Sequence, residues 1–234
     1  MERIDQVHGT FEKRITDAPK TTVSKRVIAR LPRYHRYLGD LLREGTLRIS
    51  SSALSKMMNV TASQIRQDLN CFGGFGQQGY GYNVKYLYNK ISELLGVNEG
   101  FRAVIVGAGN LGHALAATHM FERRGIERVA MFDVDPAVVG TKICGLEVHH
   151  VDELYDFCRA EGISIGVLTV PKEAAHAVTN TMIEAGVSGI WNFANMEIRS
   201  ERPGVIVENI HLGDSLMKLC YELKTSKDGS SEND

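Results

Sequence analysis

This chain of 234 residues lacks several features that would point to particular classes of protein. Its four cysteines form no CxxC pair, so neither a disulfide framework nor a zinc site is expected, and a reducing cytoplasm is the expected location. The apolar runs are long enough only for strands, so no transmembrane helix is expected. The first residues are charged and contain no apolar segment of the kind that a signal peptide needs.

The chain also has little net charge, only −1, but its charged residues are unevenly distributed along the sequence. Residues 1–90 contain 15 basic and 7 acidic side chains (net +8), whereas residues 91–234 contain 12 and 21 (net −9). This asymmetry predicts two modules with different partners, the basic one facing phosphate. The polar, aperiodic ends, residues 1–20 and 225–234, are predicted to be disordered.

Residues 24–59 show the pattern of short helices. Apolar residues recur at helical spacing, and Pro32 interrupts the pattern, which predicts a short helix and then a second one with the proline in its first turn. Ser51 or Ser52 is placed to cap a third helix, and Asn59 can end it in the left-handed conformation.

The next stretch, "TASQIRQDLN" (residues 61–70), has the features of a DNA-recognition helix. Thr61 and Gln64 have the spacing of a capping box, and Ile65 and Leu69 face inward because they lie four residues apart. The remaining polar residues are predicted to point outward and can donate to and accept from base edges in the major groove. They are Ser63, Gln64, Arg66, Gln67 and Asn70.

A glycine-rich stretch, "GGFGQQGYGYNV", follows this helix. Glycines interleaved with aromatic residues predict a hairpin that lies close to another backbone, as the wing of a winged helix does. Gln78 and Tyr80 in this hairpin are further candidates for contact with DNA. Short capped helices also occur in domains that touch no DNA, but the basic charge and the hairpin favour a winged-helix DNA-binding domain over residues 21–95.

The second module begins with "FRAVIVGAGNLGHALA", an apolar strand, a glycine-rich turn and the start of a helix. The spacing G-x-G-x-x-G is typical of a dinucleotide-binding Rossmann fold: one glycine permits the tight turn, the second lets backbone approach pyrophosphate, and the third allows close packing of helix on strand. The candidate contacts are Gly107, Ala108, Gly109, Asn110, Leu111 and Gly112.

Residues 96–210 alternate strands and helices as a Rossmann-type α/β domain should. Asp133 ends the second strand, where a carboxylate accepts from the ribose hydroxyls and repels a 2′-phosphate, so NAD is predicted over NADP, with Asp135 as the alternative. Loops at the carboxyl ends of two later strands should line the nicotinamide end. The candidates are Val170, Pro171, Asn192 and Phe193, with Leu212 as a further apolar lining residue.

No catalytic group and no metal site accompany this fingerprint. Tyr155 and Lys172 do not form a YxxxK pair, and the adjacent His149 and His150 have no third ligand at a useful spacing. His176 lies on a predicted helix, where a surface histidine is the ordinary interpretation and a base the alternative. The chain is therefore not expected to be an enzyme.

The chain resembles the Rex family of redox-sensing transcriptional repressors. The matching motifs, which span about residues 24 to 223, are "RLPRYHRYL", "RISSSALS", "TASQIRQDLNCFGGFGQQGYGYNV", "GAGNLGHALA", "FDVDP", "LTVPKEAA" and "NFA". The resemblance implies a homodimer whose C-terminal helices, residues 211–224, are exchanged. It also implies a repressor that occupies operator DNA when NADH is low and leaves it when NADH rises, with NADH and NAD+ as its effector ligands.

Some positions depart from the family pattern. Gln67 and Gln78 stand where many members have basic residues, so either two contacts with phosphate or bases are expected to be weaker or the preferred bases of the operator are expected to differ. In described members an Arg pairs with an Asp before the swapped helix in one state, and that Asp turns to a Tyr in the other. Here the corresponding positions are Arg36, His211 and Thr118, so the same ion-pair switch is not possible and desolvation of the charged nicotinamide is predicted to discriminate the two forms.

Three other interpretations remain open from the residues alone. The first is a small NAD-dependent oxidoreductase with an N-terminal helical domain, which does not explain the basic charge. The second is a DNA-binding protein that responds to another nucleotide. The third, a thiol sensor, has less support because the cysteines are isolated.

Overall fold

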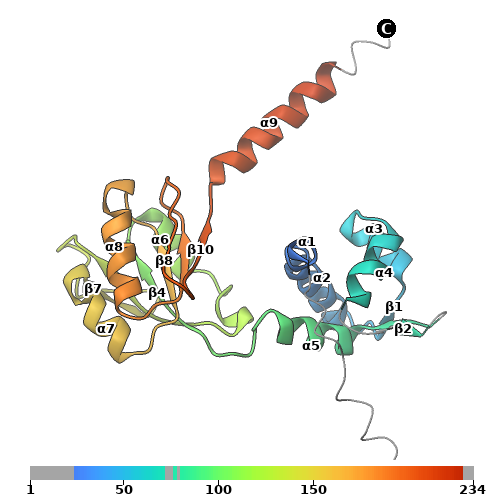
Figure 1. Cartoon of the computed structure of the whole chain (residues 1–234), viewed down its shortest axis with the longest axis horizontal. Coiled ribbons are helices and arrows are strands. Elements are labelled where there is room, and N and C mark those ends of the chain that lie inside the picture. The colour runs from blue at the N-terminus through green and yellow to red at the C-terminus, as the bar shows by residue number, and fades with distance from the viewer. Residues whose placement is uncertain (1–23, 72–75, 78–79, 229–234) are drawn as a thin grey trace, which may run out of the picture. The chain divides into compact units, whose positions relative to one another are not determined.

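The computed structural model describes residues 24–71, 76–77 and 80–228 (Figure 1). The chain divides into two compact units, one ending at Asn98 and the other beginning at Glu99. Each unit has an apolar core of its own. The domain boundary predicted from the sequence, between residues 95 and 96, stands slightly before this division.

The first unit is a small helical domain with a three-stranded sheet. Its elements are α1 (Lys25–Ile28), α2 (Leu31–Arg43), β1 (Arg48–Ile49), α3 (Ser51–Met58), α4 (Ala62–Asn70), β2 (Gly76–Gln77), β3 (Gly81–Asn83) and α5 (Val84–Leu94). Buried apolar side chains from α2, α3, α4 and α5 form its core; the largest are Tyr34, Leu38, Leu54, Met58, Ile65, Leu69, Leu87 and Ile91.

Local signals set the ends of these helices. Pro32 lies in the first turn of α2 and Asn59 ends α3 with a positive φ of 50°, as predicted. The predicted cap of α3 was wrong by one position: Ser50 is the N-cap, and its hydroxyl accepts from the Ala53 N–H at 3.0 Å, whereas Ser51 is already helical. A serine one residue earlier has the extended backbone that a cap requires.

The hairpin β2–β3 is the wing. The sheet order is β1-β3-β2, and both pairings are antiparallel. Gly81 has a φ of +69°, and a Cβ there would lie 2.7 Å from the carbonyl oxygen of Ile49 in β1. Glycine therefore permits the close approach to a neighbouring backbone that the sequence predicted.

The second unit alternates strands and helices. Its elements are β4 (Arg102–Val106), α6 (Asn110–Ala116), η2 (Glu122–Arg124), β5 (Glu127–Asp133), β6 (Lys142–Ile143), β7 (Leu146–His150), η3 (Val151–Glu153), α7 (Leu154–Ala160), β8 (Ile165–Leu168), α8 (Lys172–Glu184), β9 (Gly189–Asn192), β10 (Ile206–Asn209) and α9 (Leu212–Asp228).

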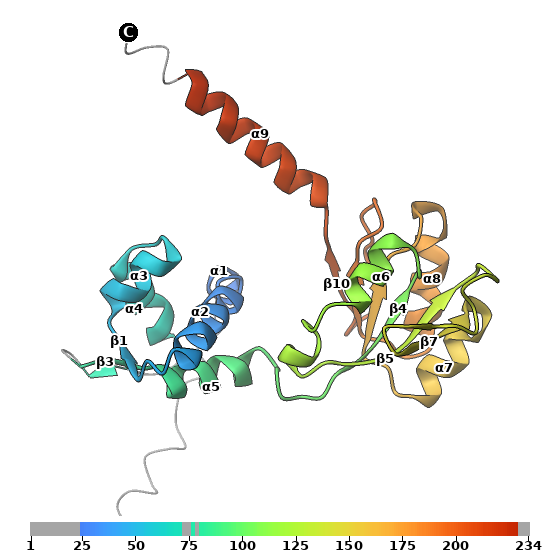
Figure 2. The same ribbon diagram turned by 180° about the vertical axis from the view of Figure 1, so that it is seen from behind.

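These strands form one sheet in the order β10-β9-β8-β4-β5-β7-β6, parallel except for β6 at the edge. Without β6 this is the strand order of the Rossmann fold, and the direction of the order reverses between β4 and β8. Helices cover both faces of this sheet (Figure 2). Alternate residues of β4 face opposite layers: Ile105 packs in one core with Ala116 of α6, and Val104 packs in the other core with residues of α7 and α8.

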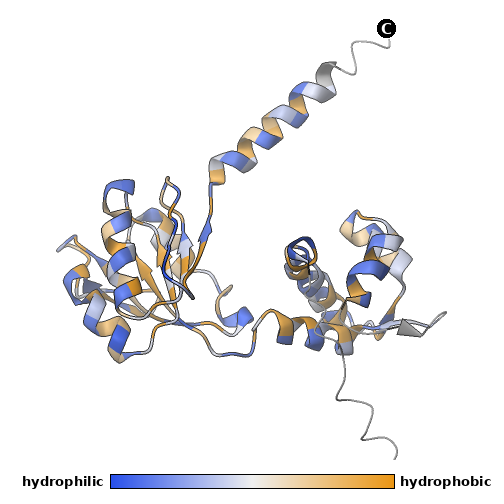
Figure 3. Ribbon diagram, viewed as in Figure 1, coloured by the Kyte–Doolittle hydropathy of each residue, from blue (hydrophilic) through white to orange (hydrophobic). Residues whose placement is uncertain are grey.

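The last helix, α9, extends beyond its predicted end at residue 224. It continues to Asp228, so part of the tail predicted to be disordered is helical. Every side chain from Leu212 to Ser226 is exposed, including large apolar ones that recur along the helix (Figure 3). In the described part of the chain, no helix combines the length and apolar character needed to cross a bilayer.

Candidate functional site

The outer face of α4 carries four of the five DNA contacts that were predicted for this helix. Ser63, Arg66, Gln67 and Asn70 are exposed, whereas Ile65 and Leu69 are buried. One Arg66 nitrogen, Nη1, lies 3.2 Å from the hydroxyl of Ser51 at the start of α3. The helix therefore presents amide, hydroxyl and guanidinium groups together, which is the chemistry that reads base edges.

Gln64 does not belong to that face. Its side chain is half-buried and its Nε2 donates to Asp68 Oδ1 at 2.8 Å. Only half of the predicted capping box forms, because the Thr61 hydroxyl accepts from the Gln64 N–H at 3.1 Å but the Gln64 amide turns to Asp68 instead. The prediction that Gln64 points outward was therefore wrong.

The inner face of α4 contains a carboxylate that the sequence analysis missed. Asp68 is fully buried, and its oxygens accept from Arg30 Nε and Nη2 at 2.7 Å each and from Tyr34 Oη at 2.9 Å. Burial disfavours the charged carboxylate, but the hydrogen bonds from Arg30, Tyr34 and Gln64 outweigh it and hold the pKa of Asp68 below its usual value. The sequence did contain a signal for this residue, because Asp68 is the only acidic residue between Glu44 and Glu93.

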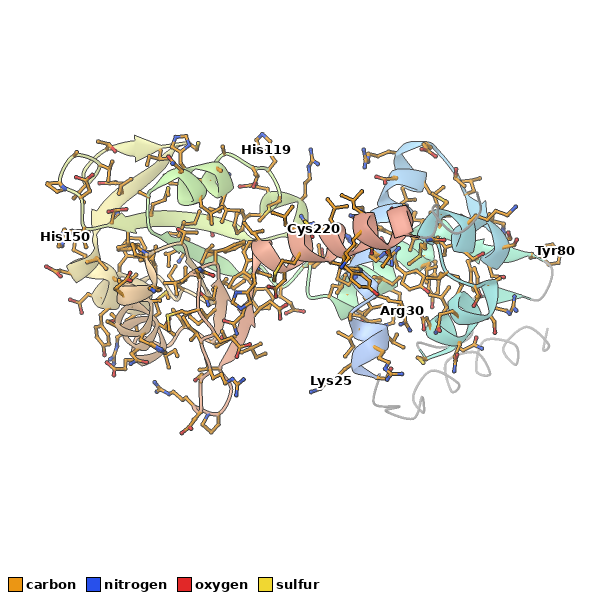
Figure 4. The ribbon with its side chains drawn as sticks, turned by 90° about the horizontal axis from the view of Figure 1, so that it is seen from above. Lys25, Arg30, Tyr80, His119, His150 and Cys220 are labelled. Carbon is orange, nitrogen blue, oxygen red and sulfur yellow. The ribbon has the colours of Figure 1, made fainter. Side chains whose placement is uncertain are left out.

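An exposed aromatic side chain of the wing lies beside a basic side chain of β1. Tyr80 is 69% exposed and lies at the outer end of the hairpin (Figure 4). Arg48 of β1 donates from Nη1 to the Tyr80 carbonyl at 3.3 Å, and its guanidinium carbon lies 6.0 Å from the centre of the tyrosine ring. Arg48 was not predicted as a site residue. Gln78 lies outside the described residues.

In the second unit, two of the three fingerprint glycines are required by the fold itself. Gly107 has a φ of +103°, and a Cβ there would lie 2.7 Å from the Thr169 carbonyl oxygen. A Cβ on Gly112 would meet the Gly107 carbonyl oxygen. Gly109 differs from both, because its φ is −68° and no atom lies within 4 Å of an added Cβ. The protein alone gives no reason for glycine at this position.

The loop that contains these glycines is held from two sides. Asp133 accepts from the Ala108 N–H at 2.5 Å and from the N–H groups of Val134 and Asp135 at 2.7 and 2.9 Å. On the other side the Thr169 hydroxyl donates to the carbonyl oxygen of Gly107 at 2.8 Å. Thr169, another residue missed from the sequence, joins the loops after β4 and β8.

The start of α6 offers free backbone donors next to this loop. Gly109 is the N-cap of the helix, and no hydrogen bond from a side chain caps it in the described structure. Asn110 is exposed and Leu111 is half-buried in the first turn. Unpaired N–H groups and the helix dipole together favour an anion here.

The predicted nicotinamide residues fall into three groups. Val170 and Phe193 are half-buried after β8 and β9, and Pro171 is exposed as the N-cap of α8. Asn192 is fully buried, and its Nδ2 donates to Met196 O and Asn209 Oδ1, both at 2.8 Å. Its Oδ1 accepts from the Ala194 N–H at 2.9 Å, so Asn192 shapes the loop rather than lining the site, which corrects its predicted role. Leu212 is 64% exposed at the start of α9.

Of the three predicted switch residues, one lies in the first unit and two lie in the second. Arg36 is exposed on α2, with its guanidinium carbon 5.3 Å from the centre of the Tyr37 ring. Thr118 follows α6 and donates to the Leu115 carbonyl at 2.9 Å. His211 is half-buried directly before α9.

The two adjacent histidines have a local structural role. His150 Nδ1 accepts from the Asp152 N–H at 3.3 Å and Glu153 accepts from the His150 N–H, which together cap η3. His149 Nδ1 lies 3.4 Å from Glu153 Oε2.

A winged-helix unit with an exposed polar helix, followed by a Rossmann-type unit with a dinucleotide loop, defines a class: DNA-binding regulators that respond to a nucleotide. Residues 22–70 match the family described as "Putative DNA-binding protein N-terminus", and residues 98–196 match the CoA binding domain family. The redox-sensing transcriptional repressor Rex of Caldicellulosiruptor saccharolyticus is 52% identical over 204 residues, 87% of this chain and 93% of that protein. Rex of Clostridioides difficile (strain 630) is 51% identical over 88% of this chain and 97% of its own length.

Two solved structures of the repressor RSP are also similar. RSP in complex with β-NAD+ and operator DNA is 47% identical, with a TM-score of 0.82 over 92% of this chain and 100% of that one. RSP in complex with β-NADH is 44% identical, with the same TM-score and coverage. The chain belongs to the Rex family of redox-sensing transcriptional repressors, which are regulators and not enzymes.

Proposed function

We propose that this chain represses transcription by binding operator DNA through its first unit and that NADH, bound to its second unit, releases it. The observation that carries the ligand half of this proposal is Gly109. Neither its backbone angles nor its neighbours require glycine, so the remaining reason is a ligand that passes close to the backbone. The RSP structures with NAD+ and NADH support a nicotinamide dinucleotide as that ligand.

Named residues of the second unit would hold the dinucleotide. The N–H groups of Gly109, Asn110 and Leu111 point from the start of α6 and would bind the pyrophosphate. Asp133 ends β5 and would accept from the ribose hydroxyls, while its charge repels a 2′-phosphate. Val170, Pro171, Phe193 and Leu212 would surround the nicotinamide.

The redox state would be read through charge. The oxidised ring is cationic and the reduced ring is neutral, so apolar side chains such as Phe193 and Leu212 disfavour the oxidised form by desolvating it. His211 and Thr118 cannot form the carboxylate–tyrosine exchange described for the family, and we propose no ion-pair switch for this chain.

The first unit would read DNA with α4 in the major groove. Ser63, Arg66, Gln67 and Asn70 would reach base edges or phosphates, and Tyr80 with Arg48 would place the wing against the backbone. A repressor acts where the DNA is, so we propose a cytoplasmic location. We also propose that a second copy of the chain covers the apolar side chains of α9, giving a homodimer that matches a palindromic operator.

One titration tests the function as a whole. A labelled palindromic duplex, selected by the protein from a randomised AT-rich library, is bound to saturation and then titrated with NADH, NAD+, NADPH, ATP or coenzyme A. Release by NADH at concentrations where NAD+ has little effect supports the proposal, whereas release by coenzyme A alone identifies another nucleotide as the effector. Steady oxidation of NADH with a substrate would favour the oxidoreductase instead.

A substitution at Arg66 tests the DNA half. Arg66→Ala should weaken operator binding by about 1–3 kcal/mol if the side chain contacts a base. Arg43→Ala is the matched control, because it removes the same charge from an exposed side chain at the end of α2, where its partner is Asp40. Equal losses of operator affinity in the two variants would show that Arg66 contributes only its positive charge and makes no specific contact.

A further inference from the structure

We propose that Asp68 is a positioning residue for DNA recognition: from inside the core it sets the rotation of α4 about its own axis and hence the direction in which Arg66 points. The proposal rests on the proposed function of α4 as the helix that reads DNA. It gives a role to a buried charge that the core of a small domain does not otherwise need.

The geometry around Asp68 is directional. Arg30, at the N-cap of α2, binds both carboxylate oxygens through Nε and Nη2 at 2.7 Å, in a bidentate fork. Tyr34, one turn further along α2, donates to Oδ2 at 2.9 Å. Gln64, which is on α4 itself, also donates a hydrogen bond to Oδ1. Two helices far apart in sequence are thus joined by three hydrogen bonds whose angles leave little freedom.

The apolar contacts of α4 are less directional than these hydrogen bonds. Ile65 and Leu69 hold the helix against the core, but hydrophobic contact is non-directional and tolerates rotation. A rotation of about 20° at the surface of a helix about 10 Å across moves a side chain by about 2 Å. Hydrogen bonds to base edges are formed only within a few tenths of an ångström, so such a rotation would break them.

A second arginine restrains the other helix of the pair. Arg33 of α2 donates from Nη2 to the carbonyl oxygen of Met58, at the C-terminal end of α3, at 2.5 Å. A cation is favourable at a helix C-terminus. Arg30 and Arg33, one turn apart, therefore attach both helices of the helix-turn-helix to α2.

The test separates orientation from stability. Full-length wild type, Asp68→Asn, Arg66→Ala and the double variant are measured against the selected palindromic duplex and a scrambled duplex of the same composition, at several salt concentrations. We expect Asp68→Asn to lower the ratio of the two affinities by about tenfold or more, in the range of one lost base contact. Its affinity for the scrambled duplex and its salt dependence should stay close to wild type, because the basic surface is unchanged.

The double variant identifies the path of the effect. If Asp68 acts in part by aiming Arg66, then Asp68→Asn should lower the ratio by a smaller factor in the Arg66→Ala protein than in the wild type, and the remaining loss would come from the other base-reading side chains of α4. Full additivity would overturn the proposal, as would a wild-type ratio in Asp68→Asn. A wild-type protein that does not prefer the selected duplex would instead refute the proposed function of α4.

An apolar replacement guards against a simple folding defect. In Arg30→Met/Tyr34→Phe/Asp68→Leu all three polar groups are removed together, and such replacements of buried ion pairs are often neutral or stabilising. We expect an unfolding midpoint at or above that of wild type and a loss of discrimination similar to Asp68→Asn. A folded triple variant with wild-type discrimination would show that shape alone orients α4 and would overturn the proposal.

Discussion

Substituting Gly109 by valine should strongly weaken the response to NADH while changing the stability of the fold little. Gly109 has a φ of −68°, which any residue adopts, and a Cβ there meets no atom within 4 Å. The only local penalty is the poorer N-cap preference of valine, on the order of 1 kcal/mol or less. The branched side chain would instead fill the space through which the pyrophosphate approaches the N–H groups of α6.

The size of the ligand effect follows from those N–H groups. One hydrogen bond to a charged acceptor contributes about 1.5–3 kcal/mol. Loss of a single such bond to the pyrophosphate raises the Kd for NADH about 10- to 150-fold, since about 1.4 kcal/mol corresponds to a factor of ten. Operator binding in the absence of ligand should be unchanged.

The assay uses the single tryptophan of the chain. Trp191 lies with its ring centre 4.6 Å from that of Phe193, and its emission overlaps the absorption of reduced nicotinamide, so quenching reports binding. Gly112→Ala is the contrasting variant: its Cβ would meet the Gly107 carbonyl, so it should lower the unfolding midpoint as well as ligand affinity. A folded Gly109→Val protein that binds NADH like wild type would refute the assignment of this loop.

Three further predictions follow from the same structure. Asp133→Ala should narrow the preference for NADH over NADPH, and it should also lower the affinity for both dinucleotides because Asp133 accepts a hydrogen bond from the Ala108 N–H. Asp135→Ala should leave the preference unchanged. Leu212→Asp should raise the affinity for NAD+ relative to that for NADH. His211→Ala should leave the ratio of these two affinities nearly constant in the same titration. The reverse pattern would place the switch at His211. Because the pKa of Asp68 is lower in the folded than in the unfolded protein, its ionised carboxylate stabilises the fold at pH values above the unfolded-state pKa. That stability is lost as the pH falls through the folded pKa, so acid unfolding should be less steep in Asp68→Asn.

The parts of the fold that could be predicted depend on neighbours in sequence. Helical spacing, the proline at the start of α2 and the strand–glycine–helix pattern of β4 and α6 are local features, and each corresponds to an observed element. The central strands β4 and β8 were found for the same reason, since strands buried on both faces are continuous apolar runs. The edge strand β6 is two residues long and offers no such signal.

The misassigned residues depend on partners that are distant in sequence. Gln64 looked like a surface residue because Asp68, four residues on, was not recognised as buried, and the partners of Asp68 lie 34 and 38 residues away. Asn192 was placed in the site by its position after a strand, but Asn209 of β10, 17 residues on, takes its amide. Helical and strand spacing predict the face on which a residue lies, but they do not show which polar groups from distant segments its side chain will contact.

The double anchoring of the glycine loop, by Asp133 from β5 and by Thr169 from the loop after β8, has a consequence for kinetics. A loop whose conformation is set before a ligand arrives has little entropy left to lose on binding. Its occupation should then be limited by encounter rather than by rearrangement, with an observed rate that rises linearly with ligand concentration. Any slower step in the response must arise elsewhere, in parts of the chain with fewer restraints, such as α9.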